Sequence, residues 1–138
     1  SRKLIENDYA VARQLAFWKR KMRRGWSQIA VSDYESVLRK NYRFELGVTN
    51  HSEMDVFVGD LNPEDIGVEI VTVTQDAKGK LHVHKRHTYV LESSRDGVAH
   101  FSLDITPEFA GAYQIAARIF AKNALLPHRQ DFELVKWL

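Results

Sequence analysis

The chain has 138 residues and a mass of 16.0 kDa, which is the size of one domain with a hydrophobic core of its own. Hydrophobic residues make up 44% and charged residues 28%, which excludes a disordered chain and a collagen-like repeat. There is no cysteine, which excludes disulfides, thiolate metal sites and a cysteine nucleophile and is typical of a reducing compartment. Because no membrane span and no signal peptide are recognisable, we expect a cytoplasmic protein that binds no membrane.

The start of the chain and its charge distribution indicate a piece of a longer protein. Ser1 stands where a complete protein would have an initiator methionine. Residues 1–28 carry eight Lys or Arg and only two Asp or Glu, whereas residues 29–138 carry twelve and sixteen. A basic segment followed by a mildly acidic body is typical of two units of different origin, so we place a boundary between residues 27 and 28.

The first unit has the periodicity of an amphipathic helix that ends near Gly25, a candidate C-cap. An amphipathic helix with an apolar stripe along one face needs a packing partner, either the following domain or a neighbour outside this chain. Its basic run, residues 19–24, is interpreted as a solvated or interdomain face rather than a nucleic-acid site, because the apolar stripe needs a packed partner. The apolar stripe consists of Leu4, Val11, Leu15, Trp18, Met22 and Trp26. The candidate packing or interdomain residues are Trp18, Met22, Arg23, Arg24 and Trp26.

After Gly25 the hydrophobic period changes to two, which is typical of strands. Turn sequences separate the apolar runs; examples are residues 50–52, residues 75–80 and the Asp96-Gly97 pair. Short strands at this spacing predict a mainly β protein, an antiparallel immunoglobulin-like β-sandwich of about seven strands preceded by one N-terminal helix. The longer predicted strands span residues 42–49, 68–74, 81–91, 98–105, 111–120 and 132–137.

Few residues of the chain form a pattern typical of catalysis or of a metal site. His82, His84 and His87 crowd one predicted strand, but no third ligand is evident and Lys85 and Arg86 would repel a cation, so we interpret this strand as a solvated edge. The sequence has no GxSxG, P-loop, GxGxxG or HExxH motif. We therefore predict no catalytic residue, no metal and no cofactor site within the chain.

Aromatic residues offer one further possibility, a platform on which sugar rings stack. Trp18 and Trp26 belong to the helix stripe, so core packing explains them better. Tyr89 and Trp137 are the candidates for contact with a glucan, although packing under the helix explains Trp137 equally well.

Three collinear stretches resemble the C-terminal part of the short, bacterial and archaeal type of α-glucan (glycogen/maltodextrin) phosphorylase. Residues 16–26, AFWKRKMRRGW, resemble a helix near the end of these enzymes, and residues 124–137, ALLPHRQDFELVKW, resemble their tail. Residues 61–69, LNPEDIGVE, resemble a segment between the two.

The resemblance implies that residues 28–138 are an accessory β-sandwich and that residues 1–27 connect it to a preceding catalytic domain, its partner in the same chain. The parent would be a glycosyltransferase that phosphorolyses α-1,4-glucan to glucose 1-phosphate with pyridoxal phosphate on a lysine of that earlier domain. No lysine of this chain lies in that motif, so no cofactor is expected here. The accessory domain would serve packing, contact with α-glucan or association with a second copy. The alternative hypothesis is a free-standing carbohydrate-binding β-sandwich module.

Overall fold

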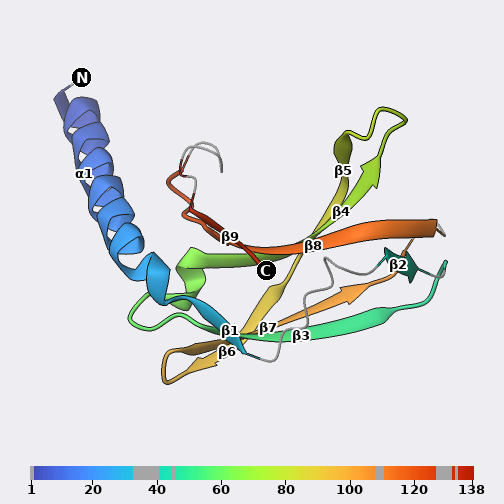
Figure 1. The fold of residues 1–138 in the computed structure, drawn as a ribbon. Coiled ribbons are helices and arrows are strands. Elements are labelled where there is room, and N and C mark those ends of the chain that lie inside the picture. The colour runs from blue at the N-terminus through green and yellow to red at the C-terminus, as the bar shows by residue number, and fades with distance from the viewer. Residues whose placement is uncertain (1, 33–40, 45, 108–110, 127–131, 133) are drawn as a thin grey trace.

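The computed structural model describes residues 2–32, 41–44, 46–107, 111–126, 132 and 134–138. Within this part, two antiparallel sheets pack face to face and one long helix, α1 (Arg2–Gly25), lies across one end of them (Figure 1). A 3-10 turn, η1 (Trp26–Gln28), leads from the helix into the first strand. The expected class, a mainly β antiparallel sandwich behind one N-terminal helix, is confirmed.

The two sheets contain four and five strands, where the sequence predicted about seven in total. The first, sheet A, has the order β1 (Ala30–Ser32), β3 (Asn50–Phe57), β7 (Val98–Ile105) and β6 (Val90–Arg95). The second, sheet B, has the order β2 (Asn41–Phe44), β8 (Gly111–Ala121), β4 (Ile66–Gln75) and β5 (Leu81–Thr88). A fifth strand, β9 (Val135–Trp137), pairs with β8 on the same edge as β2, because β4 occupies the other edge.

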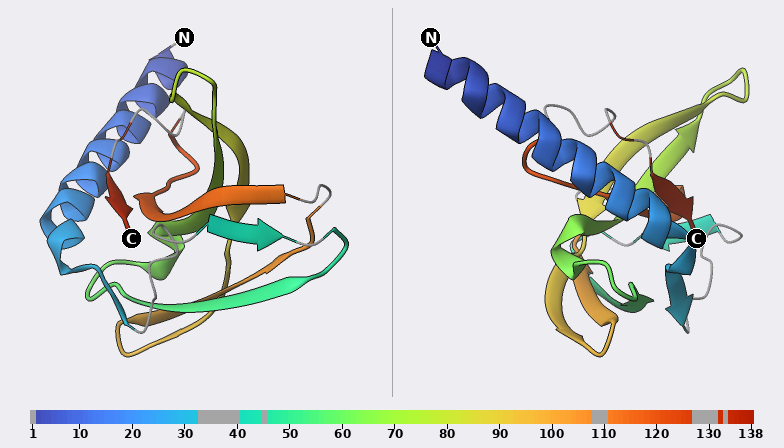
Figure 2. Two further views of the ribbon diagram at one scale, coloured as in Figure 1. Left: turned by 45° about the vertical axis from the view of Figure 1, so that its right-hand side comes forward. Right: turned by 90° about the vertical axis from the view of Figure 1, so that its left-hand side faces the viewer.

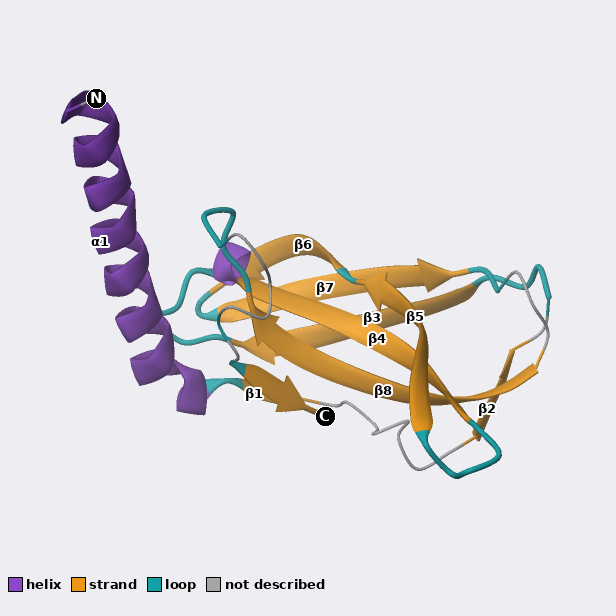
Figure 3. Cartoon of the chain, turned by 90° about the horizontal axis from the view of Figure 1, so that it is seen from above, coloured by secondary structure: helices purple, strands orange, loops and turns teal. Residues whose placement is uncertain are grey.

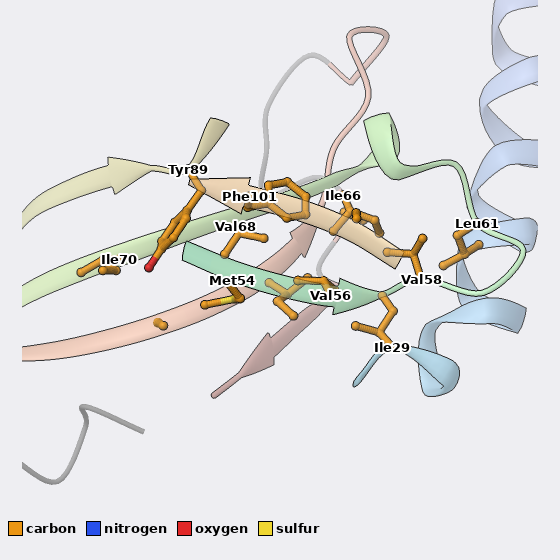
Figure 4. Packing of buried hydrophobic residues seen from close by; sticks show 14 of the residues in the cluster. Ile29, Met54, Val56, Val58, Leu61, Ile66, Val68, Ile70, Tyr89 and Phe101 are labelled. Atoms are coloured by element: carbon orange, nitrogen blue, oxygen red, sulfur yellow. The ribbon is translucent and has the colours of Figure 1, made fainter. Parts of the chain in front are cut away.

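The core lies between the sheets. Along β7, Phe101, Leu103 and Ile105 face it as the sequence alternation predicts, whereas residues 66–72 of β4 are all buried. Figure 4 shows Tyr89, Phe101 and Val68 packed around Met54 and Val56, all of them buried. The β4–β5 hairpin continues beyond this core, and its end projects from the sandwich (Figure 1). All but one of the β5 side chains are exposed, as expected for the edge strand of sheet B.

The single strand predicted over residues 81–91 is wrong, because the chain changes sheets at Tyr89. β5 ends before Tyr89 in sheet B, and β6 begins after it in sheet A. The Tyr89 amide donates to the Val68 carbonyl at 2.8 Å, and its hydroxyl lies 2.7 Å from the Ser52 hydroxyl in sheet A. The buried ring fixes the crossing, and a periodicity of two cannot reveal such a crossing.

The turn predicted at residues 50–52 is also wrong, since these residues begin β3. They pair with β7, from Asn50 opposite Ile105 to Ser52 opposite Leu103, so tertiary pairing overrides local turn preference. The chain turns instead at residues 46–49, where Gly47 has a φ of 75°. The hairpin predicted at Asp96-Gly97 is confirmed, with both residues at positive φ as a type I′ turn requires.

Candidate functional site

The C-terminal half of α1 docks on the end of the sandwich through its apolar stripe. Trp18 and Met22 are buried, with 8% and 0% of their surface exposed. Leu15 and Trp26 are partly buried against the same core. Trp18, Met22 and Trp26, three of the packing candidates, therefore lie against the core of the sandwich.

Phe132, from the segment before β9, completes this junction. Its ring centroid lies 5.2 Å from that of Trp18, and the planes are tilted by 57°. The Arg23 guanidinium lies 5.1 Å from the Phe132 ring centroid, and the Lys19 ammonium lies 5.7 Å from it. Both distances are within the range of cation–π attraction. Two residues of the basic run thus contact an aromatic ring of the C-terminal segment. The charge of residues 19–24 alone did not predict this contact.

The helix end approaches the loop before η3 (Pro63–Asp65) closely, and Gly25 makes this approach possible. A Cβ at this position would lie 2.6 Å from Leu61 Cδ2. Gly25 has φ −90° and ψ −10°, so it is needed for space and not for the left-handed conformation expected of a C-cap. Arg24, the remaining packing candidate, is exposed and lines a hollow of about 250 Å³ at the same place. The other residues around this hollow are Lys21, Gly25, Gln28, Asp60 and Leu61.

The N-terminal half of α1 projects away from the sandwich (Figure 2). Ile5, Tyr9 and Val11 are exposed there, although Val11 continues the stripe that Trp18 and Met22 bury. Seen from above, the helix runs past the ends of the strands (Figure 3). This half of the helix therefore presents apolar surface to solvent.

Trp137, one of the two glucan-contact candidates, lies on the outer face of sheet B. Its side chain is 54% exposed, and its ring stands 5.1 Å from the Arg118 guanidinium in the register row directly opposite. The Arg118 Nε donates to Glu69 Oε1, and Glu69 is only 1% exposed. A buried carboxylate thus holds the arginine that supports an exposed indole.

Tyr89, the other glucan-contact candidate, has a different environment. The side chain is buried between the sheets, and burial raises the pKa of its hydroxyl while the hydrogen bond with Ser52 acts in the opposite direction. No ring face is presented to solvent for stacking with a sugar. Its position argues for a core role, so Trp137 is the stronger candidate of the two.

The arrangement of titratable side chains in the described residues does not resemble a catalytic or cofactor site. No group of His, Asp or Glu side chains among them is arranged to hold a metal ion. His82, from the predicted histidine cluster, instead has its Nε2 2.7 Å from Asp76 Oδ2 in the hairpin. An open hollow of about 550 Å³ is lined by Glu64, Asp65, Lys122, Asn123 and Ala124.

Two of the described lysines, Lys122 and Lys136, have surroundings that do not fit pyridoxal phosphate, which the resemblance implies for the parent. A lysine that binds it needs an enclosed pocket with phosphate-binding groups. Lys122 lies in an open hollow beside two carboxylates, and the Lys136 ammonium donates to the Ile29 carbonyl at 2.7 Å.

The fold and these contacts define an antiparallel β-sandwich domain with a helix docked across one end and half of that helix left uncovered. The chain belongs to the glycogen phosphorylase C-terminal domain family, whose model matches residues 26–138. This membership confirms the resemblance and implies a catalytic domain of the same chain as partner. Comparisons with curated proteins and with solved structures gave no match. Among the described residues, no helix combines the length and apolarity needed to cross a membrane.

Proposed function

We propose that the chain is the non-catalytic C-terminal accessory domain of an α-glucan phosphorylase and that its role is mainly structural. The parent enzyme would cleave α-1,4-glucan with phosphate to release glucose 1-phosphate in the cytoplasm, using pyridoxal phosphate bound in the preceding domain. The family supports the accessory role.

The half-docked helix is the observation that carries the interface role. Trp18 and Met22 anchor α1 to the sandwich, so the exposed N-terminal half is held at a fixed direction. Ile5 and Tyr9 lie one helical turn apart, and both remain exposed. Residues 1–27 would then connect the two domains, with this half of the helix packed on the catalytic domain.

Association of the chain with a separately produced catalytic domain tests this proposal. The double variant Ile5→Glu/Tyr9→Glu should weaken the complex at least about tenfold, because two charges would be desolvated at the interface. The matched control is Leu81→Glu/Val83→Glu, which changes two similarly exposed apolar residues of the projecting hairpin. Equal affinity of the helix variant and the original chain would contradict the proposed interface.

A carbohydrate-binding role is the second candidate, and the position of Trp137 favours it. An exposed indole that an arginine supports from below can stack against a sugar ring. Trp137 is the one exposed tryptophan of the described residues, however, since Trp18 and Trp26 pack against the core. We therefore place glucan contact second to the structural role.

A further inference from the structure

The outer face of sheet A carries two histidines, each bound by a carboxylate of the neighbouring strand. His51 Nδ1 lies 2.6 Å from Asp104 Oδ1, and His100 Nδ1 lies 2.6 Å from Asp55 Oδ1. The register explains both contacts, because His51 of β3 stands opposite Asp104 of β7 and Asp55 of β3 stands opposite His100 of β7.

A fifth side chain, Glu53, lies between the two pairs on β3. Its Oε1 is 3.6 Å from His51 Nε2 and 3.3 Å from His100 Nε2. One carboxylate oxygen therefore faces the second nitrogen of both rings. We call this group of five side chains, His51, Glu53, Asp55, His100 and Asp104, the histidine–carboxylate ladder.

The protonation state of the two rings follows from these contacts. A neutral imidazole has one N–H, so it can donate to only one of the two carboxylates that it faces. Its other nitrogen then turns a lone pair toward a carboxylate oxygen, which is repulsive. An imidazolium donates at both nitrogens. The geometry at His51 and at His100 is therefore satisfied when each ring carries the additional proton.

The charged side chains described on the neighbouring strands have other partners than the two histidines. On β6, Glu92 accepts a hydrogen bond at 2.6 Å from Ser102, the residue opposite Glu53. Arg95, also on β6, forms an exposed pair with Asp96. The strand on the other side, β1, has no titratable side chain in its three residues.

The hydrogen bonds act in the same direction at both rings. Asp104 contributes most to raising the pKa of His51 above 6.5, desolvation opposes it, and Glu53 adds to the rise. Asp55 and then Glu53 raise the pKa of His100, again against desolvation.

We propose that the histidine–carboxylate ladder is a proton-binding site that couples the pairing of β3 with β7 to pH in the near-neutral range. A group that holds its proton more tightly in the folded than in the unfolded state stabilises the fold below the unfolded pKa. Its contribution is lost as the pH rises through the folded value. Sheet A should therefore be held more firmly below about pH 6.5, the ordinary value for histidine, than in mildly alkaline solution. Loss of both protons would change the charge of the ladder from one negative charge to three.

Imidazole titrations by NMR on the 138-residue chain test the site, independently of glucan chemistry and of any partner domain. The midpoints of His51 and His100 should both lie above 6.5, and Glu53→Gln should lower both because one carboxylate faces both rings. Glu92→Gln, an acidic residue of the same face outside the ladder, should move neither. A midpoint at or below 6.5 for either ring, or a Glu53→Gln variant that shifts one ring or none, would overturn the proposal.

Urea unfolding at pH 6 and pH 8 tests the coupling to stability. The urea concentration at the unfolding midpoint of the original chain should be lower at pH 8 than at pH 6. His51→Gln/His100→Gln should lose a clear part of this fall, while the control His84→Gln on β5 should keep it. An equal fall in the double variant and the original chain would contradict the coupling.

Discussion

Trp18 of α1 and Phe132 of the C-terminal segment pack ring against ring, with centroids 5.2 Å apart, and so join the two ends of the chain. The contact fixes the helix on the sandwich at one point. The exposed residues of the N-terminal half, such as Ile5 and Tyr9, depend on this docked part of the helix for their direction.

Substitution of Trp18 by alanine should therefore destabilise the domain strongly. We expect a loss of about 3–5 kcal/mol in the free energy of unfolding, the usual range for a buried tryptophan. Phe17→Ala is the matched control, because the Phe17 ring, next in sequence to Trp18, is 59% exposed. This substitution should change the free energy of unfolding by no more than about 0.5 kcal/mol. Chemical denaturation measures both losses. A loss for Trp18→Ala as small as that for Phe17→Ala would mean that the helix is not docked.

Trp18→Phe should be far milder than Trp18→Ala. The buried indole Nε1 of Trp18 has no hydrogen-bond partner among the described residues, so its removal relieves an unpaired polar group. We expect a loss below about 1.5 kcal/mol, because ring packing is largely kept. A loss as large as that of Trp18→Ala would show that the indole N–H has a partner in solution.

Removal of one partner from the buried pair of Arg118 and Glu69 should destabilise the domain. Arg118→Ala would leave the Glu69 carboxylate without this donor at 1% exposure, and we expect a loss of about 3–5 kcal/mol. Arg95→Ala is the control, since its pair with Asp96 is about 90% exposed and should contribute almost nothing. Comparable losses in both variants would contradict the difference in burial.

The sequence predicted the class of the fold and the helix stripe because both rest on local periodicity. Trp18 and Met22 could be assigned to a packed face from their spacing alone. The crossing at Tyr89 could not, since a strand that changes sheets keeps its alternation. The role of Glu69 was also missed, because a charged residue within a β-branched run gives no sign of its arginine partner on β8.

The two candidates for glucan contact, Trp137 and Tyr89, differ in how far the sequence alone could predict their positions. Trp137 could be proposed from its residue type, whereas the burial of Tyr89 depends on which sheet its strand joins. The ladder was also hidden, because residues 50–52 read as a turn and only the register with β7 places His51 opposite Asp104.

Catalysis should be absent from the isolated chain. Incubation with glycogen and phosphate should release no glucose 1-phosphate, and pyridoxal phosphate should give no absorbance change of a lysine adduct beyond that of a surface lysine. The reason is that no group of His, Asp or Glu side chains among the described residues could hold a metal ion, and the hollow beside Lys122 is open to solvent. Measurable phosphorolysis by the purified chain would refute the accessory role.

Binding of glucan by the isolated chain should be weak. We expect a dissociation constant for maltoheptaose no tighter than about 1 mM, or about −4 kcal/mol, because one exposed indole provides little stacking surface. Titration calorimetry with the original chain and with Trp137→Ala measures it. Saturable micromolar binding that Trp137→Ala abolishes would instead make the domain a carbohydrate-binding module.

The central claim is that the domain docks on its catalytic partner through the projecting half of α1. Hydrogen exchange along α1 tests this claim most directly. Amides of residues 5–14 should exchange rapidly in the isolated chain and at least about tenfold more slowly in the full phosphorylase, because packing must be broken before that half can open. Amides around Trp18 and Met22 should be protected in both. Equal, rapid exchange of residues 5–14 in the two proteins would contradict the account.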